Sequence, residues 1–194
     1  LMRTGDVRFY DLASDMIAHR VDVDHHWYPA GLGHDMQRNV ARFTHFHCSR
    51  FNYYLPSVTD NWLAGVVLWH LLTGEPKART CAERNAAALV ESWDAVAKDT
   101  SYAIGRVKGD MQGNAQSIFA FCSMHALTGE RKWLDEALKL FNTNVTAKWK
   151  AHGPHLHDPR QFKSQSYIQD DMRYCYSVHA LCLLHHMTGD EKVL

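Results

Sequence analysis

The sequence lacks an excess of charge of either sign and has no long apolar run. Its 194 residues carry 21 basic and 21 acidic side chains, so charge gives no reason to expect a nucleic acid or an anionic membrane as a partner. No apolar run approaches the length that crosses a bilayer, and no signal peptide is recognisable. We therefore expect neither nucleic-acid binding nor membrane insertion.

Motifs built on paired cysteines are also missing. The five cysteines are Cys48, Cys81, Cys122, Cys175 and Cys182. They include no CxxC pair, and four of the five fall within expected helices. An odd set without metal spacing favours reduced core thiols over a disulfide framework, which favours a reducing compartment such as the cytoplasm. No HExxH motif and no zinc-finger spacing of Cys and His occurs. The sequence therefore requires no cofactor.

What the sequence does contain is a repeat. The tripeptide Thr-Gly-acid occurs four times, at Thr4-Gly5-Asp6, Thr73-Gly74-Glu75, Thr128-Gly129-Glu130 and Thr188-Gly189-Asp190. Successive copies lie 69, 55 and 60 residues apart, so the chain contains an internal repeat, which is sought first because it decides the fold. Each of the last three copies follows an apolar segment, and each of the first three precedes an amphipathic one. This common context predicts stacked helical hairpins.

The two kinds of segment predict two kinds of helix. Residues 60–72, 115–127 and 172–187 are apolar nearly all the way round, which predicts inner helices buried on more than one side. Residues 6–18, 77–98 and 133–141 carry one apolar stripe each, which predicts outer helices with one solvated face. In residues 6–18 the expected buried stripe is Phe9, Leu12, Ala13, Met16 and Ile17. The chain begins at an outer helix without its inner partner and ends just after an inner helix. We therefore expect one all-α domain over residues 1–194, truncated at both ends.

Two long connectors concentrate the histidines. Residues 19–59 show no sustained period over about forty residues, and loops of this length are usually functional or disordered. They contain too many aromatic side chains for disorder, so we expect an ordered functional loop. Nine of the fourteen histidines lie in this connector or in residues 149–166: His19, His25, His26, His34, His45, His47, His152, His155 and His157. Both connectors run from an outer helix back to the next inner helix, so both should lie at the same end of the assembly. We therefore predict a site at that end.

The densest patch of titratable and aromatic side chains begins at His19. It contains His19, Asp22, Asp24, His25, His26, Trp27 and Tyr28. In an extended chain, Asp22, Asp24 and His26 would share one face. Carboxylates beside imidazoles could supply an acid and a base near neutral pH, and an aromatic wall could stack on a sugar ring. The alternative is a structural loop whose aspartates cap helices.

A metal site is a second hypothesis for the same connector. His45 and His47 would lie on one face of a strand, and with Asp22, Asp24 or His26 they could ligate calcium or a divalent transition ion.

The starts of two inner helices carry further candidates. Asp60, Asn61 and Trp62 open one, and Asp170, Asp171, Arg173 and Tyr174 open the last. Free N–H groups at a helix N-terminus favour an anionic substrate group, although Asp60 could simply cap its helix. This second group, two adjacent acids beside Arg173 and Tyr174, could bind a carboxylate, donate a proton or cap the helix. The remaining histidines lie along or at the far end of inner helices and are expected to be buried and hydrogen-bonded; they are His70, His125, His179, His185 and His186.

The alternation of inner helix, Thr-Gly-acid and outer helix resembles the hairpins of the (α/α) toroids, the six-hairpin barrels of many polysaccharide-degrading enzymes. More narrowly, the order His19, Asp22-Val23-Asp24-His25, Gly33-His34, His45, Asn61-Trp62, Gly65 and Leu71 to Glu75 is similar to the C-terminal toroid of the exo-rhamnogalacturonan lyase group (PcRGLX/YetA-like proteins). Asp60 stands where that group has a histidine, and Trp62 replaces a tyrosine. The resemblance implies about three hairpins of an incomplete ring, with the missing hairpins as partners.

The same resemblance implies an enzyme acting on an acidic, pectic glycan, with an oligo- or polysaccharide as its ligand. For a lyase, Arg173 or a metal would neutralise the uronate, His25 or His45 would be the base, and Tyr174 or Tyr54 the acid. For a glycoside hydrolase, Asp22 or Asp24 would pair with Asp60 or Asp170. His34 would contribute to substrate binding. The alternatives are a sugar epimerase with paired histidines and a non-catalytic helical scaffold that binds protein.

Overall fold

The computed structural model describes residues 5–25, 27, 41, 62–98, 111–147 and 167–194. Six α-helices make up most of this part of the chain: α1 (Arg8–His19), α2 (Leu63–Thr73), α3 (Pro76–Lys98), α5 (Met111–Thr128), α6 (Arg131–Leu140) and α8 (Tyr167–Thr188). Three short turns of helix complete it: the π-helical turns η1 (Arg20–Asp24) and η4 (Phe141–Val145), and the 3-10 turn η6 (Glu191–Val193). The prediction of an all-α chain of repeated helices is confirmed for these residues, while closure into a toroid stays a prediction.

The inner helices α2, α5 and α8 end in the same turn. In the first, the N–H of Gly74 donates to the His70 carbonyl oxygen at 2.7 Å, and Gly74 has φ of 74°. The Thr73 hydroxyl donates to the Trp69 carbonyl at 2.8 Å and accepts from the N–H of Glu75 at 3.2 Å. The turns at Thr128-Gly129 and Thr188-Gly189 repeat this arrangement, with φ of 72° and 68° at the glycines. No atom lies within 4 Å of a Cβ built on these glycines, so left-handed backbone is what requires glycine there.

A histidine belongs to this turn, which sequence analysis missed. The Nδ1 atoms of His70, His125 and His185 lie 2.8, 3.1 and 3.0 Å from the carbonyl oxygen of the acidic residue five positions later. A carbonyl oxygen can only accept, so Nδ1 is the donor in each turn. The repeated unit is therefore His-x-x-Thr-Gly-acid. The three histidines are hydrogen-bonded as expected, but they are only half-buried, because they lie at the solvated end of the inner helices.

The acidic residue of the turn prepares the helix that follows. A carboxylate oxygen of Glu75 accepts from the N–H of Lys77 at 3.2 Å, and Asp190 accepts from the N–H of Lys192 at 3.0 Å. Asp6 does the same for the N–H of Arg8 at 3.0 Å. A carboxylate at this place satisfies a free N–H group and opposes the positive end of the helix dipole.

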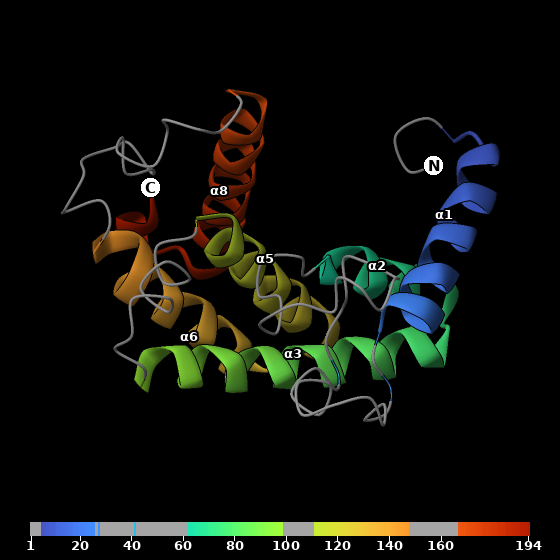
Figure 1. Cartoon of the computed structure of the whole chain (residues 1–194), viewed down its shortest axis with the longest axis horizontal. Coiled ribbons are helices and arrows are strands. Elements are labelled where there is room, and N and C mark those ends of the chain that lie inside the picture. Colours follow the sequence, from blue (N-terminus) through green and yellow to red (C-terminus); the bar gives the residue numbers. More distant parts are fainter. Residues whose placement is uncertain (1–4, 26, 28–40, 42–61, 99–110, 148–166) are drawn as a thin grey trace, which may run out of the picture.

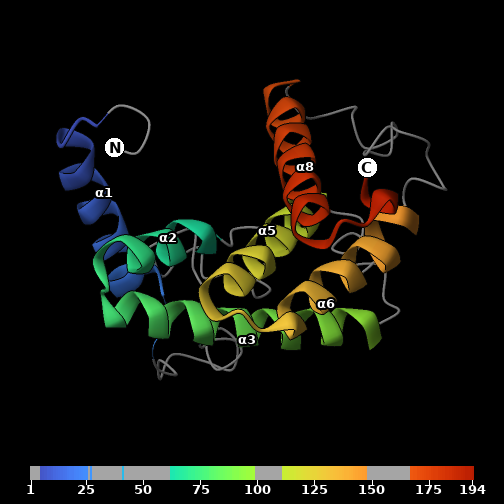
Figure 2. The same cartoon turned by 180° about the vertical axis from the view of Figure 1, so that it is seen from behind.

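The inner helices pack side by side in chain order, and the outer helices cover them. Figures 1 and 2 show α3 running beneath α2 and α5, with α6 beside it and α8 rising above α5. The inner helix α5 packs against both α2 and α8, and each hairpin packs on itself. Fully buried side chains such as Leu63, Phe121 and Leu134 form a continuous core across the three hairpins. The outer helices are also joined directly, since Lys139 Nζ on α6 lies 2.7 Å from Asp94 Oδ1 on α3.

The stripes predicted for α3 and α6 are largely buried, but the stripe predicted for α1 is not. No residue of α1 is buried, and Phe9, Leu12 and Met16 are exposed. The helix contacts α2 at two places. The ring centroids of Tyr10 and Trp69 lie 5.1 Å apart, and Ile17 Cδ1 lies 3.6 Å from the position of a Cβ built on Gly65. Figure 1 shows α1 standing at the end of the assembly, so among the described residues its apolar stripe has little to pack against.

Candidate functional site

A cavity of about 760 Å³ lies between α1 and α8, with α2 and α5 as its floor. This volume is within the range of small-molecule sites, roughly 300 to 1,000 Å³. Its lining comprises Asp15, Met16, Ile17, His19, Arg20 and Asp24 from the α1 side, Trp62, Ala64 and Gly65 from the start of α2, Ala115, Gln116 and Phe119 from α5, and Tyr176 and His179 from α8. The cavity thus brings together three of the predicted site residues, His19, Asp24 and Trp62.

One wall is organised by an ion pair in the π-helical turn η1. Arg20 Nη1 donates to Asp24 Oδ2 at 2.9 Å, and both side chains are largely buried. His19 Nε2 lies 3.6 Å from Asp24 Oδ1, and half of its side chain is exposed. An ion pair removed from water needs its partners held in good geometry, and the helical spacing of four residues provides this. The wall therefore presents a fixed carboxylate, Asp24, beside the imidazole of His19.

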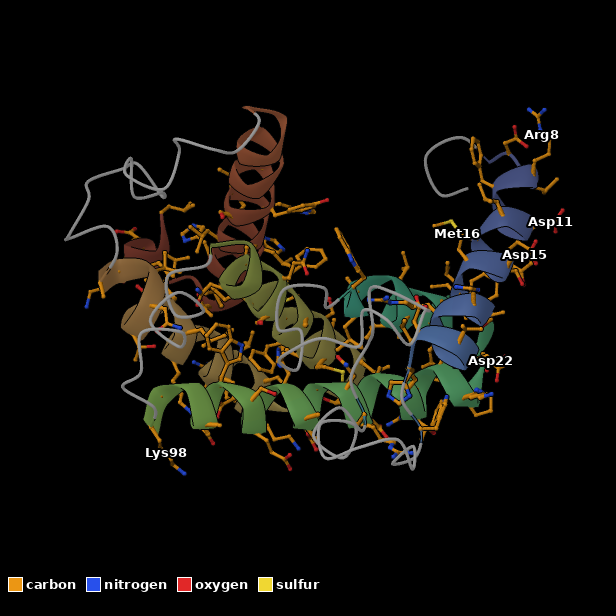
Figure 3. All side chains as sticks on the ribbon, in the orientation of Figure 1. Arg8, Asp11, Asp15, Met16, Asp22 and Lys98 are labelled. Atoms are coloured by element: carbon orange, nitrogen blue, oxygen red, sulfur yellow. The ribbon has the colours of Figure 1, made fainter. Side chains whose placement is uncertain are left out.

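Asp22 lies elsewhere, because this segment is helical and not extended. Two residues along a helix differ by roughly 200° in direction, so Asp22 and Asp24 do not share a face. Asp22 forms an exposed ion pair with Lys77 at the start of α3, and this hydrogen bond raises the pKa of Lys77. Figure 3 shows Asp22 on the outer side of the helix end, whereas Met16 projects toward α2.

His25 and Trp27 anchor the end of this segment to α3. The His25 ring is buried and meets the Trp27 ring edge-on, with centroids 4.5 Å apart. Trp27 Nε1 donates to the Val21 carbonyl at 2.7 Å, and Arg84 donates to the Trp27 carbonyl at 2.8 Å while lying 5.3 Å from the ring centroid. Neither ring lines the cavity. Their observed contacts are those that hold η1, and with it Asp24, in place.

The floor and the second wall carry residues that sequence analysis missed. The rings of Trp62 and Tyr176 meet edge-on with centroids 5.3 Å apart, and those of Phe119 and His179 lie 4.8 Å apart. Gln116 is buried beside them. Gln116 and Tyr176 occupy the same position relative to the threonine of their turns, as do Phe119 and His179. Alignment of the repeats on their Thr-Gly turns could have identified these positions.

Several predicted residues lie outside the described part of the chain. These are His26, Tyr28, His34, His45, His47, Tyr54, Asp60 and Asn61. The helix expected to open at residue 60 begins at Leu63, preceded by Trp62. The last inner helix begins at Tyr167, so Asp170, Asp171, Arg173 and Tyr174 lie within α8 and not at its cap; only their backbone is described. The helical pattern begins earlier there than apolar periodicity indicated.

Metal and thiol chemistry have no assembled site in the described ranges. No group of three or more His, Cys, Asp or Glu residues there could hold a metal ion, and Asp22 pairs with Lys77 whereas Asp24 pairs with Arg20. Burial raises the pKa of the Cys81 and Cys122 thiols to about 12, which makes both unreactive near neutral pH. None of the helices described is both long and apolar enough to cross a membrane.

Comparison with protein-family models, with curated proteins and with solved structures finds no match for this chain. The cavity itself must therefore carry the functional argument. Its described lining combines Arg20 with Asp15 and Asp24, and adds two imidazoles, His19 and His179. Carboxylate and imidazole side chains are among the groups that act as general acids and bases in proteins.

Proposed function

We propose that this chain is part of a carbohydrate-active enzyme of the (α/α)-toroid type and that the cavity binds a sugar chain. One observation carries the proposal: a single cavity of about 760 Å³ collects aromatic and titratable side chains from helices far apart in sequence. Trp62 and Tyr176 offer rings on which the apolar face of a sugar can lie. His19, Asp24 and His179 offer groups for acid and base chemistry beside them.

The reaction we propose is β-elimination or hydrolysis of an acidic, rhamnogalacturonan-like glycan. Hydrolysis needs two carboxyl groups flanking the bond; Asp24 lines the cavity, and Asp60 or Asp170 would supply the second. Elimination needs a cation for the uronate, and Arg20 is already paired with Asp24. In a lyase the cation would therefore be Arg173 or a divalent ion such as calcium.

Titration of the purified protein with rhamnogalacturonan oligosaccharides tests this proposal. Tryptophan fluorescence reports binding, reducing ends report hydrolysis, and ultraviolet absorbance of an unsaturated uronide reports elimination. Trp62→Ala should weaken binding by about five- to tenfold, because a lost aromatic contact costs roughly 1 kcal/mol. The control is Phe9→Ala, an exposed aromatic on α1 outside the cavity lining. Absence of binding and of both products with wild-type protein would refute the proposal.

A sugar epimerase is the second candidate. The observation in its favour is that His19 and His179 come from α1 and α8, which rise on either side of the cavity. Two imidazoles on opposite walls could remove a proton from one face of a sugar and return it to the other. Interconversion of free monosaccharides without cleavage of oligosaccharides would select this function.

A further inference from the structure

The Asp24 carboxylate in η1 faces a different partner with each of its oxygens. Oδ2 accepts from Arg20 Nη1 at 2.9 Å, and Oδ1 lies 3.6 Å from His19 Nε2. The Asp24 side chain is 10% exposed, whereas that of His19 is 51% exposed. A ligand in the cavity can therefore reach the imidazole far more easily than the carboxylate. This difference indicates that Asp24 acts on a ligand through His19.

The turn that carries Asp24 is anchored to the outer helix α3. Val21, in the same turn, is buried in the core, and its carbonyl oxygen accepts from Trp27 Nε1 at 2.7 Å. Arg84 on α3 donates in turn to the Trp27 carbonyl oxygen at 2.8 Å. These contacts fix the turn, so Asp24 can serve as the fixed point that orients the ring of His19, the last residue of α1.

The carboxylate also decides which nitrogen of His19 is basic. A carboxylate oxygen can only accept a hydrogen bond, so it favours an imidazole whose Nε2 carries the hydrogen and leaves Nδ1 as the basic nitrogen. A separation of 3.6 Å is longer than a hydrogen bond, but catalytic hydrogen bonds commonly shorten when substrate binds. The histidines of the Thr-Gly turns have the opposite arrangement, because their Nδ1 atoms donate to carbonyl oxygens.

We propose that Asp24, held by Arg20, is a positioning residue and that His19 is the base of the cavity. This role rests on the proposed function and narrows the reaction to elimination. His19 Nδ1 takes the proton from the carbon beside the uronate carboxyl group, and the C–H electron pair forms the new double bond. The bond to the leaving oxygen breaks, that oxygen takes a proton from a general acid, and His19 then releases its proton to solvent.

Nitrogen NMR at alkaline pH tests the orientation without a substrate, because the chemical shifts show which ring nitrogen carries the hydrogen. We expect the hydrogen on Nε2 in His19 and on Nδ1 in His125, which serves as the internal reference. Asp24→Asn should shift His19 toward a mixture of the two forms. The matched control is Asp11→Asn, an exposed aspartate of α1 outside the cavity lining (Figure 3), which should leave the His19 signals unchanged. A His19 ring with its hydrogen on Nδ1, or one that does not respond to Asp24→Asn, overturns the proposal.

A double-mutant cycle on rhamnogalacturonan oligosaccharides tests the role in the reaction, with absorbance of the unsaturated uronide as the readout. His19→Gln should lower kcat by about a hundred- to ten-thousand-fold, and Asp24→Asn by at least about tenfold with little change in KM. The double variant should be no slower than His19→Gln alone, because a residue that acts through His19 has no effect once the imidazole is gone. Losses that multiply would show that Asp24 acts directly on the substrate and would overturn the proposal, as would cleavage by the wild type without unsaturated product.

Circular dichroism checks that the variants are folded, since Asp24→Asn takes the carboxylate away from the buried Arg20. Arg20→Gln combined with Asp24→Asn removes both charges, and this pair replaces Asp24→Asn in both experiments if that variant does not fold. Wild-type protein that neither binds nor cleaves the oligosaccharides refutes the proposed function. The NMR experiment then still decides whether Asp24 orients His19.

Discussion

Replacement of Gly129 by alanine tests whether the turn after α5 depends on left-handed backbone alone. Gly129 has φ of 72°, and no atom lies within 4 Å of the position of an added Cβ. Steric clash with neighbours therefore contributes nothing, and the cost is that of holding an L-residue in this conformation, about 1 to 2 kcal/mol. For a chain of this size, such a loss lowers Tm by roughly 2 to 8 °C.

The assay is urea unfolding followed by circular dichroism, with Gly129→Asn as the matched control. Asparagine tolerates left-handed backbone better than alanine. Gly129→Asn should therefore lower the free energy of unfolding by less than half as much as Gly129→Ala. Gly74→Ala and Gly189→Ala should give similar losses, because φ at these turns is 74° and 68°. Equal stability of the wild type and Gly129→Ala would refute the reasoning. Equal losses for alanine and asparagine would show that a side chain, and not backbone strain, is responsible.

Three further predictions concern burial and charge. Under native conditions at about pH 8, a thiol reagent should modify Cys182 and leave Cys122 unmodified until the protein unfolds, because burial raises the pKa of Cys122 to about 12 and removes it from solvent. Leu134→Ala should lower the free energy of unfolding by about 2 to 5 kcal/mol in a denaturant titration, since the side chain is fully buried. Lys139→Met should cost less than about 1 kcal/mol, because the ion pair is partly exposed. Asp94 raises the pKa of Lys139, so this contribution is complete below the usual lysine value of 10.5 and is lost at higher pH.

The helices could be predicted from the sequence because their burial repeats. The apolar stripe of α3 and the nearly continuous apolar surface of α5 both correspond to real packing, and the Thr-Gly turns fall where expected. The stripe of α1 has the same appearance in the sequence but is exposed. Periodicity reports which face of a helix is suited to burial, whereas burial also requires a neighbour.

The candidate site was predictable in part. Sequence reasoning identified His19, Asp24 and Trp62, which line one cavity, from their titratable and aromatic character. It missed Tyr176 and His179 because they lie inside an apolar helix, where polar residues usually have a structural role. It also treated residues 20–24 as an extended chain, so it placed Asp22 beside Asp24. The helical turn there depends on packing against α3, which no local pattern reveals.

The histidine in each Thr-Gly turn has a fixed tautomer. Because Nδ1 carries the hydrogen that reaches the carbonyl oxygen, the lone pair of His70, His125 and His185 resides on Nε2. Each of the three hairpin corners therefore uses an imidazole Nδ1–H to close the turn, so a side chain without a donor at this position cannot close it in the same way.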